Sequence, residues 1–116
     1  MLEGIRYLHE QGVAHRDIKP QNLIVTKENK VKILDFNVSS RKESKSQAFR
    51  MMTKTGTVAF SAPEIFTERV YNEKVDIWSA GTVLYMMLCG QQPFFHDNVA
   101  RLVQLITTDD PKMDDF

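Results

Sequence analysis

Hydrophobic side chains recur with helical spacing in three parts of the chain. In residues 1–12 they stand at positions 2, 5 and 8, and the glycine that closes this stretch predicts the end of an amphipathic helix. Residues 73–90 are apolar nearly all round, which predicts a helix buried at the centre of the domain. In residues 99–106 the apolar side chains share one face, and Asp97 is expected to cap this last helix.

The spacing changes between the first two of these helices. Residues 23–25 and 31–34 are short runs of β-forming residues joined by a polar turn, which predicts a β-hairpin. Residues 35–60 are rich in Ser, Thr and Lys without a sustained period, and loops of this length are usually functional or disordered. Pro63 then fits the first turn of a short helix. The pattern therefore predicts an α+β, mainly helical domain with one small hairpin.

Composition adds limits to this picture. The 116 residues suffice for one domain, and the formal net charge of zero gives no reason to expect nucleic acid or an anionic membrane as a partner. Cys89 has no second cysteine to pair with, and the first ten residues lack the apolar core of a secretory signal, so an intracellular, cytoplasmic location is expected. The longest apolar run is shorter than the roughly 20 residues of a membrane span. Its residues Trp78, Met86, Met87 and Cys89 are expected in the core.

The stretch AHRDIKPQN, residues 14–22, gathers groups suited to phosphoryl transfer. Asp17 stands on a turn that contains Pro20, where its carboxylate can accept a proton from a hydroxyl. Lys19 lies two positions further on and offers a compact positive charge suited to a transferring phosphoryl group. Asn22 has a carbonyl oxygen, which is a hard ligand suited to Mg²⁺.

Asp35 completes this set because a hairpin returns the chain close to where it started. It follows the second predicted strand, so its carboxylate is expected to face Asn22 across a gap the size of a hydrated metal ion. Taken singly, Asp17 or Asp35 would more simply be a turn residue that bonds its own backbone. Taken together, a base, a cation and two oxygen ligands predict phosphoryl transfer.

These motifs resemble the catalytic core of eukaryotic protein kinases. HRDIKPQN fits the H-R-D-x-x-x-x-N pattern of the catalytic loop, DFN stands where the metal-binding D-F-G is found, and APE matches the end of the activation segment. GTVAF before SAPE resembles the substrate-facing loop, and DIWSAG resembles the start of the central helix. The resemblance covers nearly the whole chain, and five motifs in register make it very specific.

The resemblance implies a role for each residue of the set. Asp17 would be the catalytic base that orients the substrate hydroxyl, and Lys19 would contact the γ-phosphate of ATP. Asn22 and Asp35 would hold Mg²⁺. Thr57 resembles the threonine that hydrogen-bonds to the base and to the lysine, and together with Lys19 it indicates the Ser/Thr-specific branch.

Four further residues are implied to support this site. Asp76 resembles the aspartate that anchors the backbone of the catalytic loop, and it also fits an N-terminal cap of the central helix. Ile24 resembles the residue that packs beneath adenine. His15 and Phe36 resemble stacked spine residues that link the two lobes of a kinase.

The segment before APE resembles an activation loop. Thr53 stands three residues before Gly56, where such kinases often carry an activating phosphate, and Arg16 would pair with it through a bidentate contact. An upstream activating kinase is then an implied partner. Weaker phosphorylation candidates are Thr55, Ser44 and Ser46. The Lys- and Ser-rich composition fits a merely solvated loop equally well.

Two features depart from the family pattern. Asn37 replaces the glycine of D-F-G, and since Asn tolerates positive φ better than most residues, the turn is expected to survive with less freedom to switch. A glycine-rich loop, a lysine strand and an αC glutamate cannot be placed, and Glu64 of APE has no later arginine to pair with. Residues 1–116 are therefore expected to form a partial kinase domain, a fragment of the large lobe with the N-terminal lobe absent.

Three functions remain open for this chain. The first is transfer of the γ-phosphate of ATP to Ser or Thr of a protein substrate, in a full-length context and with ATP and Mg²⁺ as cofactors. The second is a truncated or pseudokinase-like scaffold that binds proteins without catalysis. The third is an inert piece whose exposed apolar surface promotes aggregation.

Overall fold

The computed structural model of the chain describes residues 1–41 and 57–111. One helix comes first, very short strands follow it, and helices form the rest of this part of the chain. In chain order the elements are α1 (Leu2–Glu10), β1 (Val13–Ala14), β2 (Leu23–Val25), β3 (Val31–Ile33), β4 (Ser40–Arg41), α2 (Glu64–Thr67), α3 (Val75–Cys89) and α4 (Val99–Thr108). Single 3₁₀ turns at Pro20–Asn22 and Val58–Phe60 complete them.

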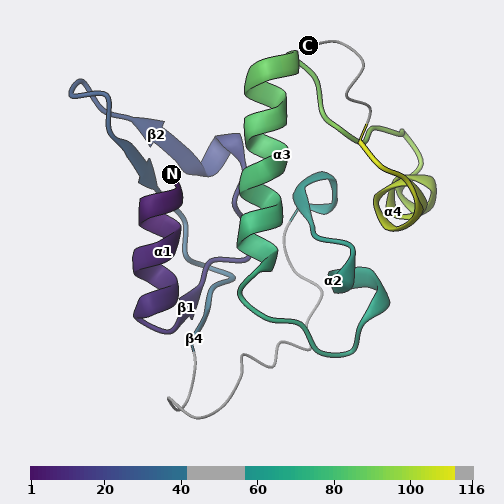
Figure 1. Cartoon of the computed structure of the whole chain (residues 1–116), viewed down its shortest axis with the longest axis horizontal. Helices are drawn as coiled ribbons and strands as arrows, with labels where there is room; N and C mark the ends of the chain where they lie inside the picture. Colours follow the sequence, from purple (N-terminus) through teal and green to yellow (C-terminus); the bar gives the residue numbers. More distant parts are fainter. Residues whose placement is uncertain (42–56, 112–116) are drawn as a thin grey trace.

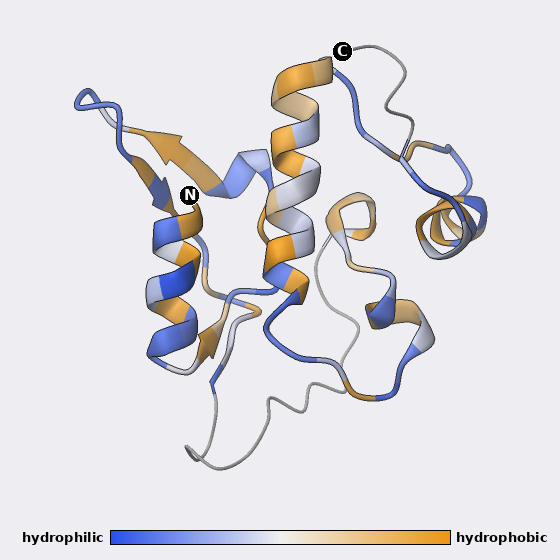
Figure 2. Cartoon of the chain, in the orientation of Figure 1, coloured by the Kyte–Doolittle hydropathy of each residue, from blue (hydrophilic) through white to orange (hydrophobic). Residues whose placement is uncertain are grey.

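Helix α3 forms the axis of the molecule. Figure 1 shows α1 and the β2–β3 hairpin on one side of α3, and α2 and α4 on the other. The hydrophobic residues of α1 lie in patches between hydrophilic ones, whereas α3 is hydrophobic over most of its length (Figure 2). None of the helices in the described residues is long and apolar enough to span a membrane.

The predicted hairpin is confirmed. Strands β2 and β3 pair antiparallel with Leu23 opposite Ile33, and Asn29 takes a φ of 57° in the turn between them. The pairing continues past the strands because the Leu34 N–H donates to the Asn22 carbonyl at 2.8 Å. The residue after Leu34 is Asp35, so the hairpin returns the chain beside the catalytic-loop motif.

A second two-stranded sheet was not predicted. Strands β1 and β4 pair antiparallel, with Ala14 opposite Ser40. Two residues in each strand are too few to show an alternating pattern, so the sequence carries no local signal for them. Their pairing holds the segment after DFN against the start of the catalytic loop.

Buried apolar residues form separate clusters around α3 and α4. Ile5 of α1 and Ile18 of the catalytic loop are fully buried, and both pack in one cluster with Ala80 and Val83 of α3. Ile5 and Ile18 therefore fix how α1 and the loop lie against the central helix. Phe94, Leu102 and Ile106 form a separate cluster between α4 and the loop before it.

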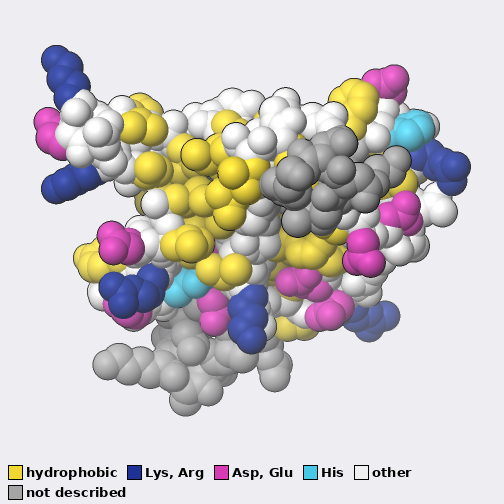
Figure 3. Space-filling view, turned by 45° about the horizontal axis from the view of Figure 1, so that its top comes forward, with side chains coloured by type: hydrophobic (Ala, Val, Ile, Leu, Met, Phe, Trp, Pro, Cys, Tyr) yellow, Lys and Arg dark blue, Asp and Glu magenta, His cyan; other side chains and the backbone are white. Residues whose placement is uncertain are grey.

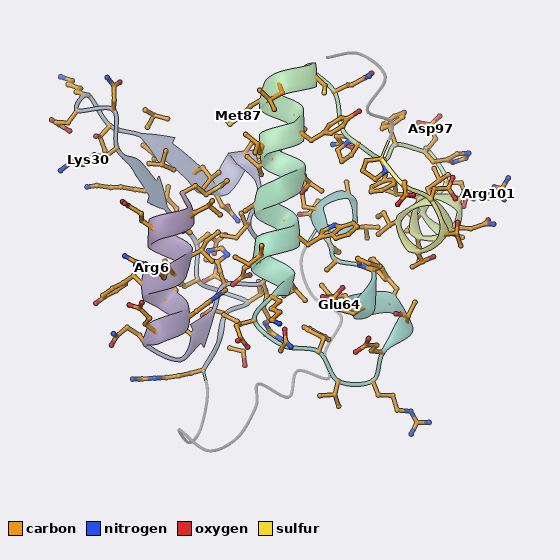
Figure 4. All side chains as sticks on the ribbon, viewed as in Figure 1. Arg6, Lys30, Glu64, Met87, Asp97 and Arg101 are labelled. Atoms are coloured by element: carbon orange, nitrogen blue, oxygen red, sulfur yellow. The ribbon has the colours of Figure 1, made fainter. Side chains whose placement is uncertain are left out.

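The prediction that α3 is buried all round was wrong on one side. Ile77, Leu84 and Leu88 are about half exposed or more, and Met87 is 76% exposed. Figure 4 shows Met87 projecting from α3 instead of entering the core. Cys89, which was expected to be buried, is half-buried. The residues of the described chain that pack on α3 leave this side uncovered. The helix ends as expected, with Gly90 in the left-handed conformation at a φ of 73°.

Two predicted helix caps were also wrong. Asn98 caps α4 in place of Asp97, since its side-chain oxygen accepts a hydrogen bond from the Arg101 N–H at 3.1 Å. Asp97 lies exposed one residue further out. Lys74 stands at the cap position of α3 and makes no side-chain cap. Asp76 lies inside the first turn, and its carboxylate binds the catalytic loop instead.

Candidate functional site

Asp76 holds the backbone of the HRD motif. Its side chain is fully buried, and its two oxygens accept hydrogen bonds from the backbone N–H groups of His15 and Arg16, each at 2.8 Å. A buried carboxylate is costly unless several donors compensate it, and each amide held here gains a charged acceptor. Arg16 takes a φ of 68°, in the left-handed region that side chains disfavour, so these two bonds oppose that strain.

His9 is a member of this cluster that the sequence reasoning missed. Its Nε2 lies 2.8 Å from the Asp76 Oδ2 that also binds the His15 amide. The residues are 67 positions apart, so no local spacing reveals the contact. The sequence shows His9 only as a polar residue near the end of an amphipathic helix. Such residues are common, so this position alone does not predict a contact with Asp76.

His15 connects the catalytic loop to the segment after β3. It is fully buried, its Nε2 lies 2.8 Å from the Leu34 carbonyl, and its Nδ1 accepts from the Asp17 N–H at 3.2 Å. These partners assign the neutral ring with the proton on Nε2. The ring meets Phe36 edge-to-face at 4.9 Å and 70°, where a stacked pair was expected. An edge-to-face contact suits the charge distribution of aromatic rings.

Asp17, Lys19 and Thr57 form a closed hydrogen-bonded triangle. The Lys19 ammonium lies 2.7 Å from the Asp17 Oδ2 and donates to the Thr57 Oγ1 at 2.8 Å. The backbone N–H and the hydroxyl of Thr57 both donate to the Asp17 Oδ1, at 3.1 and 3.2 Å. Residues 40 positions apart are therefore joined around one carboxylate.

The triangle controls the charge of Asp17. Partial burial acts to raise the pKa of Asp17, but the hydrogen bond and positive charge of Lys19, followed by the two hydrogen bonds from Thr57, outweigh it. The pKa of this carboxyl therefore lies below its ordinary value. Asp17 is ionised at neutral pH and can accept a hydrogen bond from a hydroxyl.

The backbone brings Asn22 close to the residue before Asp35, since the Leu34 N–H donates to the Asn22 carbonyl at 2.8 Å. The Asn22 side-chain nitrogen donates to the carbonyl and the Oδ2 of Asp17, at 2.8 and 3.1 Å, so the amide oxygen is the atom that could bind a metal. The described residues contain no cluster of three or more His, Cys, Asp or Glu suited to a metal. One carboxylate and one amide oxygen fit Mg²⁺, which takes many of its ligands from phosphates and water.

The turn at DFN corrects the expectation for Asn37. Arg16, Asn29 and Asp35 are the non-glycine residues with positive φ in the described chain, and Asn37 is absent from this set. Asp35 itself takes the left-handed conformation, at a φ of 59°, and its Oδ1 accepts from the Asn37 N–H at 3.2 Å. Asn37 therefore fits this turn without the positive φ that glycine tolerates best.

The remaining predicted residues have simpler surroundings. The Arg16 Nε donates to the Val38 carbonyl at 2.6 Å, which leaves its two terminal nitrogens for another partner. Ile24 on β2 is 49% exposed. Glu64, at the start of α2 (Figure 4), takes part in none of the ion pairs of residues 1–41 and 57–111. The phosphorylation candidates Thr53, Thr55, Ser44 and Ser46 lie outside the described residues.

Comparison with known proteins agrees with this geometry. A family model described as protein kinase domain matches residues 1–114. CBL-interacting protein kinase 16 of Oryza sativa subsp. japonica is 40% identical over 107 residues, which is 91% of this chain and 24% of that protein. Calcium/calmodulin-dependent protein kinase type 1 of Macrobrachium nipponense is 40% identical over 105 residues, covering 88% and 29%.

A third relative extends the agreement to another kinase. CBL-interacting serine/threonine-protein kinase 20 of Arabidopsis thaliana is 41% identical over 108 residues, which is 92% of this chain and 25% of that protein. The chain spans less than a third of the length of each of these relatives. The match nevertheless covers nearly all of this chain, so the chain belongs to the eukaryotic protein kinase family and to its Ser/Thr branch.

Proposed function

We propose that residues 1–116 are the part of a kinase large lobe that contains the catalytic loop, the activation segment and the central helix. In a full-length context they transfer the γ-phosphate of ATP to Ser or Thr of a protein substrate. The observation that supports this most is the triangle of Asp17, Lys19 and Thr57, in which one ionised carboxylate is oriented from both of its oxygens.

Asp17 is the base in this proposal. The substrate hydroxyl donates its hydrogen bond to the Asp17 carboxylate, which points its oxygen at the γ-phosphorus. The bond from this oxygen to phosphorus forms as the bond to the ADP oxygen breaks, and the hydroxyl proton passes to Asp17. Because the pKa of Asp17 is lowered, orientation of the hydroxyl contributes more than strong basicity.

Lys19 and the metal ligands neutralise the negative charge of the phosphates in this proposal. The Lys19 ammonium, held between Asp17 and Thr57, supplies a positive charge next to the base, where the γ-phosphate must lie during transfer. Asn22 and Asp35 would hold Mg²⁺, which neutralises charge on the ATP phosphates when bound. Ile24, half exposed on the hairpin, is the proposed surface beneath adenine.

Arg16 provides a route to regulation by phosphorylation. Its Nε is fixed by Val38, so the terminal nitrogens are held in one direction beside the catalytic loop. A phosphate on Thr53 or Thr55 would gain two parallel charge-assisted hydrogen bonds there. An upstream kinase is the partner that this arrangement requires.

A chimeric kinase tests the catalytic proposal. Residues 1–116 replace the corresponding segment of the Macrobrachium nipponense kinase, which supplies the parts of the catalytic domain outside this chain. We expect phosphate transfer to a Ser/Thr peptide, and a loss of about 100-fold or more for Asp17→Asn with an unchanged circular dichroism spectrum. Asp97→Asn, at an exposed position, is the matched control and keeps full activity. An inactive chimera, or full activity in Asp17→Asn, contradicts the proposal.

A binding scaffold is the second candidate function, and an exposed apolar surface favours it. Val31 and Phe36 are 40% and 44% exposed around the hairpin. Figure 3 shows hydrophobic side chains gathered between the charged tip of the hairpin and the centre of the molecule. A thermal-shift titration of the chain with ATP and Mg²⁺ separates the candidates, since saturable stabilisation that Asp35→Asn removes indicates nucleotide binding. A flat titration together with an inactive chimera favours the scaffold.

A further inference from the structure

The 3₁₀ turn at Val58–Phe60 begins at Thr57, the residue through which it meets Asp17. Both hydrogen bonds from Thr57 to the Asp17 carboxylate lie at the surface, at 3.1 and 3.2 Å. Water competes for exposed donors, so these two bonds contribute little to holding the turn in place. The position of Thr57 must therefore be fixed by contacts on the buried side of the turn.

Hydrogen bonds inside the turn join Thr57 and Phe60 into one unit. The Phe60 N–H and the Ser61 hydroxyl both donate to the Thr57 carbonyl, at 2.9 and 3.1 Å. The Ser61 N–H donates to the Val58 carbonyl at 3.0 Å. Ser61 is buried, so its hydroxyl bond is shielded from water. A displacement of Phe60 is therefore passed on to Thr57.

Ser79 of α3 holds the buried end of this unit. Its hydroxyl lies 2.7 Å from the Phe60 carbonyl and 3.0 Å from the carbonyl of Val75, one turn earlier in its own helix. A serine inside a helix often bonds to the carbonyl four residues before it, but a hydroxyl has only one proton to donate. The shorter distance assigns that proton to Phe60. Ser79 is buried, so this bond is also shielded from water.

Apolar packing brings Phe60 to α3 but does not set the direction of its carbonyl. The Phe60 side chain is buried in one cluster with Ile18, the neighbour of Asp17, and with Val83 of α3. Apolar contacts are non-directional, whereas a hydrogen bond restricts both distance and angle. The Ser79 hydroxyl therefore fixes the orientation of the peptide group after Phe60, which the packing alone leaves open.

We propose that Ser79 is a positioning residue of the phosphoryl-transfer site. It acts through the Phe60 carbonyl and the turn on Thr57, whose two donors orient the Asp17 carboxylate. Each step of this path is a hydrogen bond between described residues. The effect of Ser79 on catalysis rests on the proposed function, whereas its effect on the placement of Thr57 does not.

Proton–nitrogen NMR of the chain tests the placement of Thr57. The Thr57 N–H donates to an ionised carboxylate, so its proton resonance lies downfield, and Asp17→Asn gives its position without that charge. In Ser79→Ala we expect the resonance to move toward the Asp17→Asn position. The exchange of this amide with solvent should accelerate by about 10-fold. Ser79→Cys, whose thiol is a weak donor, should give an intermediate shift.

Thr82→Val is the matched control for loss of a buried hydroxyl on α3. Thr82 is buried, and its hydroxyl donates at 2.7 Å to the Ser79 carbonyl of the same helix. This substitution should lower the free energy of unfolding as Ser79→Ala does, but leave the Thr57 resonance in place. Ser61→Ala is the second test variant, because it removes a bond within the turn and leaves α3 intact. It should move the Thr57 resonance in the same direction as Ser79→Ala.

Kinetics of the chimeric kinase test the consequence for catalysis. We expect Ser79→Ala to lower kcat by about 10-fold with an unchanged KM for ATP, because a poorly oriented base slows transfer without weakening nucleotide binding. Thr82→Val should keep the kcat of the parent chimera. The NMR comparison uses the chain alone, so it decides the role of Ser79 separately from an inactive chimera, which contradicts the proposed function. A Thr57 resonance unmoved in both Ser79→Ala and Ser61→Ala, an equal change in Thr82→Val, or an unchanged kcat in an active chimera overturns the proposal.

Discussion

The two sides of α3 differ in whether their buried polar groups have hydrogen-bond partners and whether their apolar residues are covered. On the side of the catalytic loop, the buried carboxylate of Asp76 has three donors and the buried ring of His15 has a partner at each nitrogen. On the other side, apolar residues are exposed to solvent, and the buried Trp78 indole nitrogen has no hydrogen-bond partner among residues 1–41 and 57–111. The comparison indicates that contacts among the described residues position the catalytic-loop motif, whereas these residues leave Ile77, Leu84 and Leu88 of α3 uncovered.

The largest loss of stability is expected on the side of the catalytic-loop motif, at Asp76. Asp76→Ala leaves the amides of His15 and Arg16 and the ring of His9 without their acceptor in a buried place. We expect a loss of about 3–5 kcal/mol in the free energy of unfolding, because several donors lose a charged partner together. Urea unfolding measures it. The exposed Asp97→Ala is the control and should change stability by less than about 0.5 kcal/mol. Equal effects of the two substitutions would show that the cluster does not hold the loop.

The charge of Asp17 should respond strongly to loss of Lys19. In Lys19→Met, burial is no longer outweighed by the lysine, so the pKa of Asp17 is expected to rise. In the unmodified chain this pKa lies below its unfolded value, so the ionised carboxylate stabilises the fold above the unfolded pKa, and this contribution is lost as pH falls through the folded pKa. In the variant this difference is smaller, so Asp17 should stabilise the fold less at neutral pH and acidification should remove less stability.

Carbon NMR of the Asp17 carboxyl, titrated with acid, measures this change. Lys27→Met, on the exposed hairpin turn, is the matched control and should leave the titration where it was. A pKa of Asp17 that is the same in all three proteins would remove Lys19 from control of the base.

His9 makes an intermediate prediction on the same side of α3. His9→Ala leaves the Asp76 Oδ2 with the His15 amide and removes its side-chain donor. We expect a loss of about 1–2 kcal/mol in the free energy of unfolding. Glu10→Ala, in the neighbouring exposed pair with Arg6, should cost less than about 1 kcal/mol since surface ion pairs contribute little. His9→Gln, which retains a donor, should recover part of the loss. A His9→Ala effect no larger than that of Glu10→Ala would show that the contact adds nothing.

Much of the side of α3 that contains the catalytic-loop motif could be predicted from sequence, because the motif and the two strand runs are short and local. The spacing within AHRDIKPQN and the two strand runs predicted the hairpin and brought Asn22 near Asp35. The contacts that depend on tertiary structure were less visible: His9 meets Asp76 across 67 positions, and β1 and β4 are two residues long. The open side of α3 was missed for another reason. An all-round apolar pattern shows that a helix is to be covered, and not whether this chain supplies the cover.

The smallest effect is expected at Asn37, where the family has a glycine. If the DFN turn needed positive φ at this position, Asn37→Gly would relieve strain and stabilise the chain. Asp35 takes the positive φ instead, and the Asn37 N–H already donates to its carboxylate. We therefore expect Asn37→Gly to lower the free energy of unfolding by about 0.4–1 kcal/mol, because glycine gains freedom in the unfolded chain. Urea unfolding beside Asn29→Gly, at a position with positive φ, provides the contrast, since that change should cost less or stabilise the chain. Stabilisation by Asn37→Gly would contradict the turn as described and would identify Asn37 as a strained substitution at the DFN turn.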